Sequence, residues 1–380
     1  MDFKLTEQQQ LIQNMTRNFA EEELKPIVVD YDERGEFPLD AYKKMGEMGL
    51  IGLPYPKEYG GSGGDYLSYA LAVEEISKIS GAMGISYSVV TSLCSGAIYS
   101  FATEEQKKKY LPDLLTGKKL GSFGLTEPNA GSDASGIRTV AVKEGDHYIL
   151  NGSKCFTTNG PLSDTFMVVA ITDKEKGPKG ISAFIVEKSF PGFKVGKIEN
   201  KCGIRSAQVS EIFFENCIVP AENLIGGKEG IGLKVAFSTL DGGRIGVAAQ
   251  GLGIAEGAFN IAKQHLKERI LFGKPLYKNQ YLAFKMAELD LEIEQAKYIL
   301  YKAAIDKQEG RPFSVSAAKA KLACTNAAMH VTTEAVQMLG GYGYMREYQV
   351  ERMFRDAKIT QIYEGTNEIQ KLIISGDLFK

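Results

Sequence analysis

GSFGLTEPNAGSDASG, residues 121–136, lies where the hydrophobic pattern of this 380-residue chain changes. Before it, apolar residues recur at helical spacing, starting from a capping-box pattern at Thr6. After it come short strand-like runs such as FMVVAIT (166–172), and helical spacing returns from about residue 230. The sequence therefore predicts three domains, which are helical residues 1–120, β-rich residues 121–229 and helical residues 230–380.

Two further local patterns carry predictions. No Lys or Arg occurs between Lys78 and Lys107, and ISGAMGISYSVVTSLCSGAIYSFA (79–102) is predicted to be buried helix. That helix is either plain core or the wall of a site for an uncharged ligand group. Asn151-Gly152, between two strand-like runs, is the strongest hairpin signal in the chain, so a turn is expected there.

The composition argues against several classes of function. Charged residues make up 24% of the chain, with a formal net charge of -2 and no block of like charge, so neither nucleic acid nor a membrane surface is an expected partner. No apolar run approaches the ~18 residues that a membrane span requires. The N-terminal MDFKLTEQQQ lacks the apolar run of a secretory signal, so a cytoplasmic location is expected.

Cysteine and histidine usage points away from disulfides and metal sites. The five cysteines are scattered and form no C-x-x-C pair. His147, His265 and His330 are far apart in the sequence, and none lies in an H-E-x-x-H arrangement. We therefore expect no bound metal.

Three stretches could carry chemistry, and each has a plainer alternative. The loop 121–136 can present backbone amides to a ligand, or it can simply connect two domains. Asp241 and Arg244, three residues apart, can clamp a polar ligand or form a surface ion pair. Glu364 directly precedes Gly365, which can end a helix, and Thr366, which can cap the next one. A carboxylate at such a break can act as a base in an apolar cleft or be solvated at a helix end.

Six motifs, in this order, resemble those of the acyl-CoA dehydrogenase family, and the likeness covers essentially the whole chain. They are FGLTEPNAGSD (123–133), KCFTTNG (154–160), LDGGR (240–244), ERILFGKPLYKNQ (268–280), QMLGGYGY (337–344) and QIYEGTNE (361–368). Short-chain, butyryl-CoA-type members are the most similar. The resemblance implies an α+β multidomain fold with an N-terminal helical domain, a middle β-barrel-like domain and a C-terminal four-helix bundle. It also implies FAD as cofactor and a homotetramer.

The resemblance further implies roles for individual residues. FAD contacts within one subunit fall on Phe123, Leu125, Thr126, Gly131, Ser132, Phe156, Thr158, Thr366 and Glu368. Contacts to the flavin of a neighbouring subunit fall on Arg269, Phe272, Gln280, Gln337, Gly340 and Gly341. Contacts to the CoA thioester fall on Ser132, Asp241, Arg244 and Gly365. Many relatives have Trp where Phe156 stands, and this chain contains no Trp.

Glu364 occupies the position of the family's catalytic base, which implies that it removes the α-proton of the thioester while the β-hydride passes to flavin N5. A second branch of the family has its catalytic base at the position of Gly243 in this chain. Of the two positions at which the family has its base, only Glu364 therefore carries a carboxylate here. Relatives that act on dicarboxylyl-CoA have an arginine in the pocket wall, which residues 79–106 lack. A short, uncharged acyl chain is the substrate that this pattern favours.

The direction of the reaction stays open at this stage. The resemblance implies an electron-transferring flavoprotein as redox partner. In an anaerobe the same site could serve as an enoyl-CoA reductase for crotonyl-CoA or an aromatic, cinnamoyl-type thioester. An acyl-CoA oxidase would share the first half-reaction. Relatives of this fold that bind nucleic acid are a non-enzymatic alternative, which the near-neutral charge disfavours.

Overall fold

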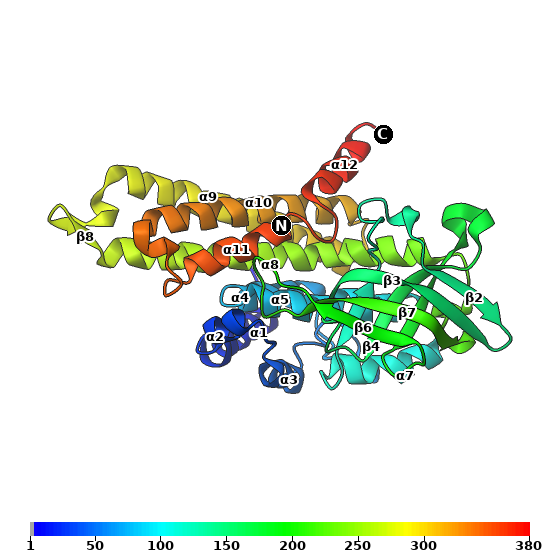
Figure 1. The fold of residues 1–380 in the computed structure, drawn as a ribbon. Helices are drawn as coiled ribbons and strands as arrows, with labels where there is room; N and C mark the ends of the chain where they lie inside the picture. Colours follow the sequence, from blue (N-terminus) through cyan, green and yellow to red (C-terminus); the bar gives the residue numbers. More distant parts are fainter. Residues whose placement is uncertain (1–3) are drawn as a thin grey trace.

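The computed structural model describes residues 4–380, in which short N-terminal helices, a curled sheet and a bundle of long helices pack together (Figure 1). The first three residues, which belong to the N-terminal stretch considered above, lie outside the described residues. The capping box at Thr6 is confirmed, because the Thr6 hydroxyl and the Gln9 side chain each accept from the other residue's backbone N–H. The N-terminal helices are α1 (Glu7–Phe19), α2 (Val28–Arg34), α3 (Leu39–Glu47), α4 (Tyr66–Ser77), α5 (Gly81–Ser88), α6 (Ser95–Phe101) and α7 (Glu104–Leu115), with π-helical turns η1 (Ala20–Leu24) and η3 (Val89–Cys94).

The predicted buried helix at 79–102 is confirmed as the continuous run α5, η3 and α6, which packs against α8 and the start of the sheet. The prediction that no apolar run approaches the length of a membrane span is wrong for Gly81–Phe101, which is long and apolar enough to cross a membrane, but 94% of its most apolar stretch is buried inside the protein. This segment is therefore a core helix of the fold.

The middle of the chain forms a seven-stranded mixed sheet in the order β1-β4-β2-β3-β7-β6, with β5 paired to the other edge of β4. Its strands are β1 (Gly121–Gly124), β2 (Val140–Glu144), β3 (His147–Thr158), β4 (Thr165–Ile171), β5 (Ile181–Glu187), β6 (Phe193–Ile198) and β7 (Val209–Pro220). Strands β4 and β5 are buried along almost their whole length, because α8 and the N-terminal helices cover one side of the sheet.

The hairpin predicted at Asn151-Gly152 is wrong. Strand β3 runs straight through this pair, and the turn lies instead at Gly145-Asp146, between β2 and β3. Asn151 accepts a hydrogen bond from the backbone of Asn216 on β7 (2.8 Å), and the β3–β7 ladder shifts register next to it. A Cβ on Gly152 would lie 2.6 Å from Thr139 Oγ1, so this glycine permits a close strand approach within a bulge.

The C-terminal part is a bundle of long helices. They are α8 (Gly232–Glu268), α9 (Gln280–Gln308), α10 (Ser314–Leu339), α11 (Val350–Thr360) and α12 (Asn367–Leu378), with a small hairpin, β8 (Ile270–Leu271) and β9 (Lys274–Pro275), between α8 and α9. Small residues bury the middle of α8 against α4 and α10, and a Cβ on Gly253 would lie only 2.3 Å from the Glu74 carbonyl oxygen. Figure 1 shows α8 to α11 side by side, with α12 leaving the body.

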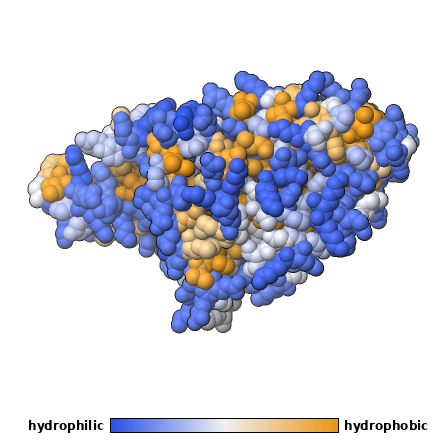
Figure 2. Space-filling model, turned by 90° about the horizontal axis from the view of Figure 1, so that it is seen from below, coloured by the Kyte–Doolittle hydropathy of each residue, from blue (hydrophilic) through white to orange (hydrophobic). Residues whose placement is uncertain are grey.

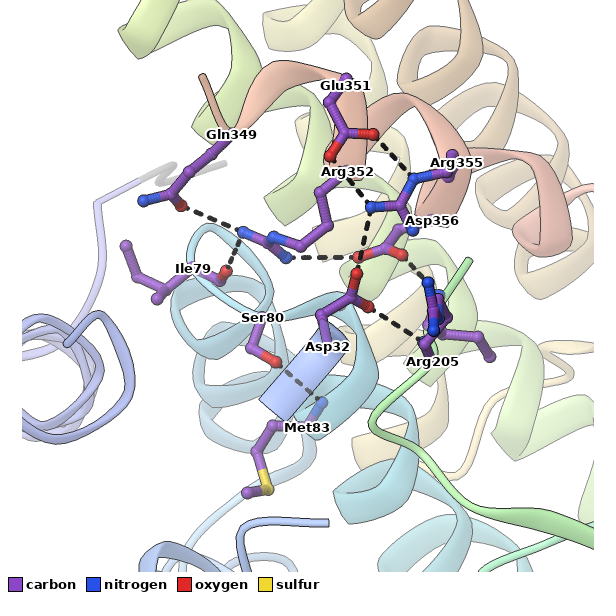
Figure 3. A network of polar contacts seen from close by, with 12 residues as sticks. Asp32, Ile79, Ser80, Met83, Arg205, Gln349, Glu351, Arg352, Arg355 and Asp356 are labelled. Carbon is purple, nitrogen blue, oxygen red and sulfur yellow. Dashed lines mark hydrogen bonds and ion pairs between the residues drawn. The ribbon is translucent and has the colours of Figure 1, made fainter. Parts of the chain in front are cut away.

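Helix α11, which leads to Glu364, is fixed by a buried polar network (Figure 3). Arg355 pairs with Asp32 of α2 at 3.0 Å, and Arg352 pairs with Asp356 at 3.3 Å. Asp356 in turn accepts the backbone N–H of Ile204, in the loop after β6. These contacts join α11 to the N-terminal helices and to the middle sheet, so the position of the segment that follows α11 is set by all three parts of the chain.

Candidate active site

Glu364 lies in the turn between α11 and α12. Helix α11 ends at Thr360, four residues before Glu364, and Thr366 caps α12, so the predicted helix break is confirmed but begins earlier than Gly365. Glu364 and Gly365 both have left-handed backbone, with φ of 52° and 91°. A glutamate in this region is rare, and it persists only where its surroundings hold it. The turn therefore aims the Glu364 side chain away from the direction that a continuous helix would give it.

The Glu364 carboxylate is buried, which excludes the alternative of a solvated helix-end residue. Neither of its oxygens has a hydrogen-bond partner among residues 4–380. A Cβ on Gly243 of α8 would lie 2.1 Å from Glu364 Oε2 and 2.6 Å from Leu93 Cδ2, so these three residues meet at one point. Burial raises the pKa of Glu364 to about 7, although Lys321 and Arg244 act to lower it. Such a carboxyl group can accept or release a proton near neutral pH.

Asp241 and Arg244 lie beside this carboxylate on α8. They form an ion pair in which the Arg244 side chain is 7% exposed, so the alternative of a surface ion pair is also wrong. Asp241 additionally accepts from the Ser314 hydroxyl at 3.0 Å. Arg244 Nε is buried and has no partner in the described part of the chain, and desolvation lowers the pKa of Arg244. This orphaned donor is available to a ligand that enters next to Glu364.

The loop after β1 is held at its base by hydrogen bonds and an ion pair, whereas its tip is exposed. Glu127 accepts the backbone N–H of Thr139 (3.1 Å) and pairs with the buried Lys154 Nζ (2.6 Å), which also donates to the Leu125 carbonyl (3.3 Å). At the tip, Gly131 and Ser132 are exposed, and a Cβ on Gly131 would meet no atom within 4 Å. A rigid base with an open tip suits a loop that presents its amides to a ligand.

Phe156 and Thr158 adjoin this loop on β3. The Cys155 N–H donates to the Thr126 carbonyl (2.9 Å), and Ser122 Oγ donates to the Thr158 carbonyl (2.8 Å). The β3–β7 register shifts between Lys154 and Thr157, and Phe156 has φ of 55° with 68% of its area exposed. The bulge thus turns this aromatic ring out of the sheet.

Apolar packing connects the loop with the carboxylate. Phe123 of β1, Leu240 of α8 and Tyr363, the neighbour of Glu364, all pack against one cluster of buried residues that includes Leu93. Thr366 and Glu368 lie in the first turn of α12, directly after the Glu364 turn. Strand β1, helix α8 and the Glu364 turn are therefore linked through one buried apolar cluster.

The residues predicted to contact the flavin of a neighbouring subunit lie far from Glu364. Arg269, Gly340 and Gly341 line a hollow of ≈ 500 Å³ between the end of α8 and the end of α10. Phe272, at the tip of the β8–β9 hairpin, is 97% exposed, and the two glutamines lie at the start of α9 (Gln280) and in the last turn of α10 (Gln337). Figure 1 shows β8 at the opposite end of the bundle from α12, and Figure 2 shows apolar surface at that tip.

The helix rise gives the separation of these two sets. Arg244 and Arg269 are 25 residues apart along α8, which corresponds to about 37 Å at 1.5 Å per residue. One chain consequently does not bring the Arg269 set into contact with Glu364.

Sequence reasoning missed Lys321, a buried lysine of α10 whose ammonium lies 2.8 Å from the Gly365 carbonyl oxygen. A signal was present, because Lys321 follows Ala317 and precedes Cys324 on the apolar face of α10.

Comparison with known proteins identifies the family. The chain matches the family model for the N-terminal domain of acyl-CoA dehydrogenases at residues 6–118, the middle-domain model at 122–217 and the C-terminal-domain model at 230–379. This chain belongs to the acyl-CoA dehydrogenase family. The family and the fold class predicted from the sequence are thus confirmed, and the domain limits 1–120, 121–229 and 230–380 stay a prediction.

Curated relatives of this family member match over its whole length. It is 58% identical to the short-chain specific acyl-CoA dehydrogenase of Clostridium acetobutylicum, with 100% of each chain covered. It is 46% identical to the acryloyl-CoA reductase (NADH) of Anaerotignum propionicum, covering 100% of this chain and 96% of the relative. Family members of both names are therefore close in sequence to this one.

Solved structures agree with this assignment. Butyryl-CoA dehydrogenase from Megasphaera elsdenii has a TM-score of 0.98 and 51% identity, with 100% of each chain covered. A second similar chain comes from a structural study of the electron transferring flavoprotein of Acidaminococcus fermentans and its mechanism of flavin-based electron bifurcation. That chain has a TM-score of 0.99 and 54% identity, again with 100% of each chain covered. The predicted likeness to short-chain, butyryl-CoA-type members is confirmed.

Proposed function

We propose that this protein is an FAD-dependent acyl-CoA dehydrogenase that interconverts short-chain acyl-CoA and trans-2-enoyl-CoA. The observation that carries this proposal is the Glu364 carboxylate, which is buried and unpaired and has a pKa of about 7. It lies beside the largely buried Asp241–Arg244 pair, and the unpaired Arg244 Nε can donate a hydrogen bond to a polar part of the CoA thioester. Short-chain acyl-CoA dehydrogenase relatives at up to 58% identity support the same reaction.

In this mechanism Glu364 is the base. Its ionised carboxylate takes the α-proton of the bound acyl thioester, and in the reverse direction the protonated group returns it to Cα. The Glu364 backbone N–H would polarise the thioester carbonyl, which favours the enolate charge that develops as the proton leaves. Burial next to Gly243 and Leu93 shields the carboxylate from water and raises its pKa to about 7.

The residues present fit FAD. Exposed Phe156 offers a stacking surface, Gly131 and Ser132 are exposed at the tip of the loop after β1, and the hollow at Gly340 and Gly341 is lined by Arg269, a partner for phosphate. Bound FAD would supply the acceptor for the β-hydride at N5. The residues that would hold it are Phe123, Leu125, Thr126, Gly131, Ser132, Phe156, Thr158, Thr366 and Glu368 of one chain, and Arg269, Phe272, Gln280, Gln337, Gly340 and Gly341 of another.

A homotetramer follows from two separate exposed apolar surfaces. The residues proposed for each flavin site include Arg269, which lies about 37 Å from Arg244 along α8, so a second copy would complete each site. Ile270, Leu271 and Phe272 form one exposed apolar surface at the β8–β9 tip. Leu372, Leu378 and Phe379 of the α12 region form another. Pairing of each of these two surfaces with its own copy would join four chains in closed symmetry.

The wall beside Glu364 supports a short, uncharged acyl group. Leu93 and Val89 belong to the π-helical turn η3, and the whole run from α5 to α6 carries no Lys or Arg. Leu93 of this wall lies next to Gly243 at the place where Glu364 Oε2 also approaches that glycine, so an apolar side chain adjoins the carboxylate. The run from α5 to α6 itself supplies no Lys or Arg to pair with a carboxylate-bearing acyl chain.

A second candidate is the same site acting as an enoyl-CoA reductase. The relative named acryloyl-CoA reductase favours it, and proton transfer through Glu364 is reversible. Likeness to a chain from the electron transferring flavoprotein study supports a redox partner of that class. We place both reactions in the cytoplasm.

Anaerobic mixing of the FAD-bound protein with butyryl-CoA, and of the dithionite-reduced protein with crotonyl-CoA, tests the proposal. We expect rapid bleaching of the flavin absorbance in the first case and rapid recovery in the second. With FAD bound, no change in either case would overturn the short-chain assignment, and an aromatic enoyl-CoA would then be the next substrate to test. Peroxide release at every aerobic turnover would assign an oxidase instead.

A further inference from the structure

Lys321 is a buried cation that the reaction scheme above does not use. Its side chain extends from α10 to the Glu364 turn and has no exposed area. The ammonium donates to the Gly365 carbonyl oxygen at 2.8 Å and to Asn367 Oδ1 at 3.1 Å. Burial of an ammonium is costly unless hydrogen bonds compensate it, so these two contacts are the reason that Lys321 is tolerated here.

The same face of α10 holds the turn through two further side chains. Thr325, one helical turn after Lys321, donates to Asn367 Oδ1 at 3.1 Å. Asn326 Oδ1 accepts from the side-chain amides of Asn367 and Gln361, both at 3.0 Å. Both sides of the Glu364 turn are therefore tied to α10.

The backbone at Glu364 needs such support. Glu364 and Gly365 both have left-handed φ, a conformation that is unfavourable for the glutamate because it has a Cβ. The Gly365 carbonyl, which directly follows the peptide of Glu364, accepts from Lys321 Nζ and from Gln370 Nε2, both at 2.8 Å. These donors fix the orientation of the peptide plane that joins Gly365 to Thr366.

We propose that Lys321 is a positioning residue for proton transfer: by holding the Gly365 carbonyl it fixes the left-handed turn that aims the Glu364 carboxylate at Cα of the substrate. This inference rests on the proposed function of Glu364 as base. Lys321 touches neither substrate nor reacting atoms in this account, and acts through the turn.

Lys321 also acts on Glu364 through charge. The groups that face the carboxyl are Lys321 from α10, the Asp241–Arg244 pair from α8, and Tyr66 and Tyr69 from α4. Burial lowers the pKa of Lys321 itself to about 7, and the protonated form is the larger of the two cationic influences that lower the pKa of Glu364. Loss of the protonated amine must therefore raise the pKa of the base at pH values below about 7.

Three variants of the FAD-bound protein separate these roles. Lys321→Met removes the donor and the charge, Lys321→Gln keeps a donor without the charge, and Lys319→Met is the matched control on the exposed side of α10. Amide hydrogen exchange over residues 361–368 reports the turn without any need for turnover. Flavin reduction by butyryl-CoA, followed against pH and substrate concentration, reports proton transfer.

In Lys321→Met we expect the backbone amides of residues 361–368 to exchange about tenfold faster than in the wild type, since a hydrogen bond from a charged donor contributes about 1.5 kcal/mol or more. Its limiting reduction rate should fall about 10–100-fold with half-saturation nearly unchanged, and its pH midpoint should rise. Lys321→Gln should restore the protection of these amides from exchange and part of the flavin reduction rate, but the pH midpoint of reduction should stay raised. Lys319→Met should match the wild type.

The inference would be overturned if the amides of residues 361–368 exchanged at the same rate in Lys321→Met as in the wild type. Faster exchange spread over all of α10 with a lowered melting temperature would also overturn it, because Lys321 would then be a structural core residue. If the wild type itself is not reduced by butyryl-CoA, the proposed function fails, and the exchange measurement still decides whether Lys321 fixes the turn.

Discussion

Gly243→Ala should disable the base without unfolding the protein. Gly243 lies on α8 where Glu364 and Leu93 meet, and an added Cβ would lie 2.1 Å from Glu364 Oε2. Real Cβ contacts below 3.0 Å essentially do not occur, so the carboxylate must withdraw by about 0.9 Å. A displacement of about 1 Å between reacting groups can cost roughly 100-fold in rate, which corresponds to about 2.7 kcal/mol of activation free energy.

Stability should change little in this variant. Replacing glycine by alanine within a helix favours folding by about 0.5–1 kcal/mol, which offsets part of the cost of moving Leu93. The matched control is Gly251→Ala, also on α8, where the nearest atom to the new Cβ, the Cys324 carbonyl oxygen, is 3.2 Å away. We expect this control to keep the wild-type rate.

The assay is anaerobic stopped-flow reduction of bound flavin at saturating butyryl-CoA, together with FAD content and melting temperature. We predict a limiting rate near 1% of wild type for Gly243→Ala at unchanged FAD content. A rate within threefold of wild type would refute the reasoning, because it would show that Glu364 does not react from its position against Gly243.

Three other predictions use the same structure. Burial raises the pKa of Glu364 from 4.5 to about 7, so the wild-type protein loses stability as the pH rises through this range. In denaturant unfolding, Glu364→Gln should be more stable than the wild type at pH 8, by up to roughly 3 kcal/mol, and equally stable near pH 4.5. Phe156→Trp places the only tryptophan in the chain on the proposed flavin face, and its fluorescence should be quenched when FAD is added to apoprotein; unchanged emission would remove Phe156 from that face. Phe272→Asp charges a 97% exposed ring, and light scattering should show loss of the species of about 166 kDa, four chains of 41.6 kDa, together with loss of FAD absorbance. A tetramer that keeps its FAD would contradict that role.

Local signals in the sequence predicted features that depend on neighbouring residues. The capping box at Thr6, the buried helix at 79–102 and the cap at Thr366 each rest on a few consecutive side chains, and each is confirmed. The order of helical and β-rich segments likewise followed from periodicity, and the motif resemblance supplied the family.

Features that depend on distant residues could not be predicted in this way. Asn151-Gly152 has turn chemistry, but its partners Asn216 and Thr139 draw it into a strand bulge. Burial of Glu364 depends on Gly243 and Leu93, more than 100 residues earlier in the chain, so the sequence left its solvated alternative open. The role of Lys321 depends on a turn 43 residues later.

The central claim is that the Glu364 carboxylate is the base, and flavin reduction by butyryl-CoA in Glu364→Gln tests it most directly. The amide has almost the same size and cannot accept the α-proton. We expect FAD binding as in the wild type and a limiting rate reduced about 10³–10⁴-fold at every pH. A rate within tenfold of the wild type, still rising with pH through about 7, would contradict it.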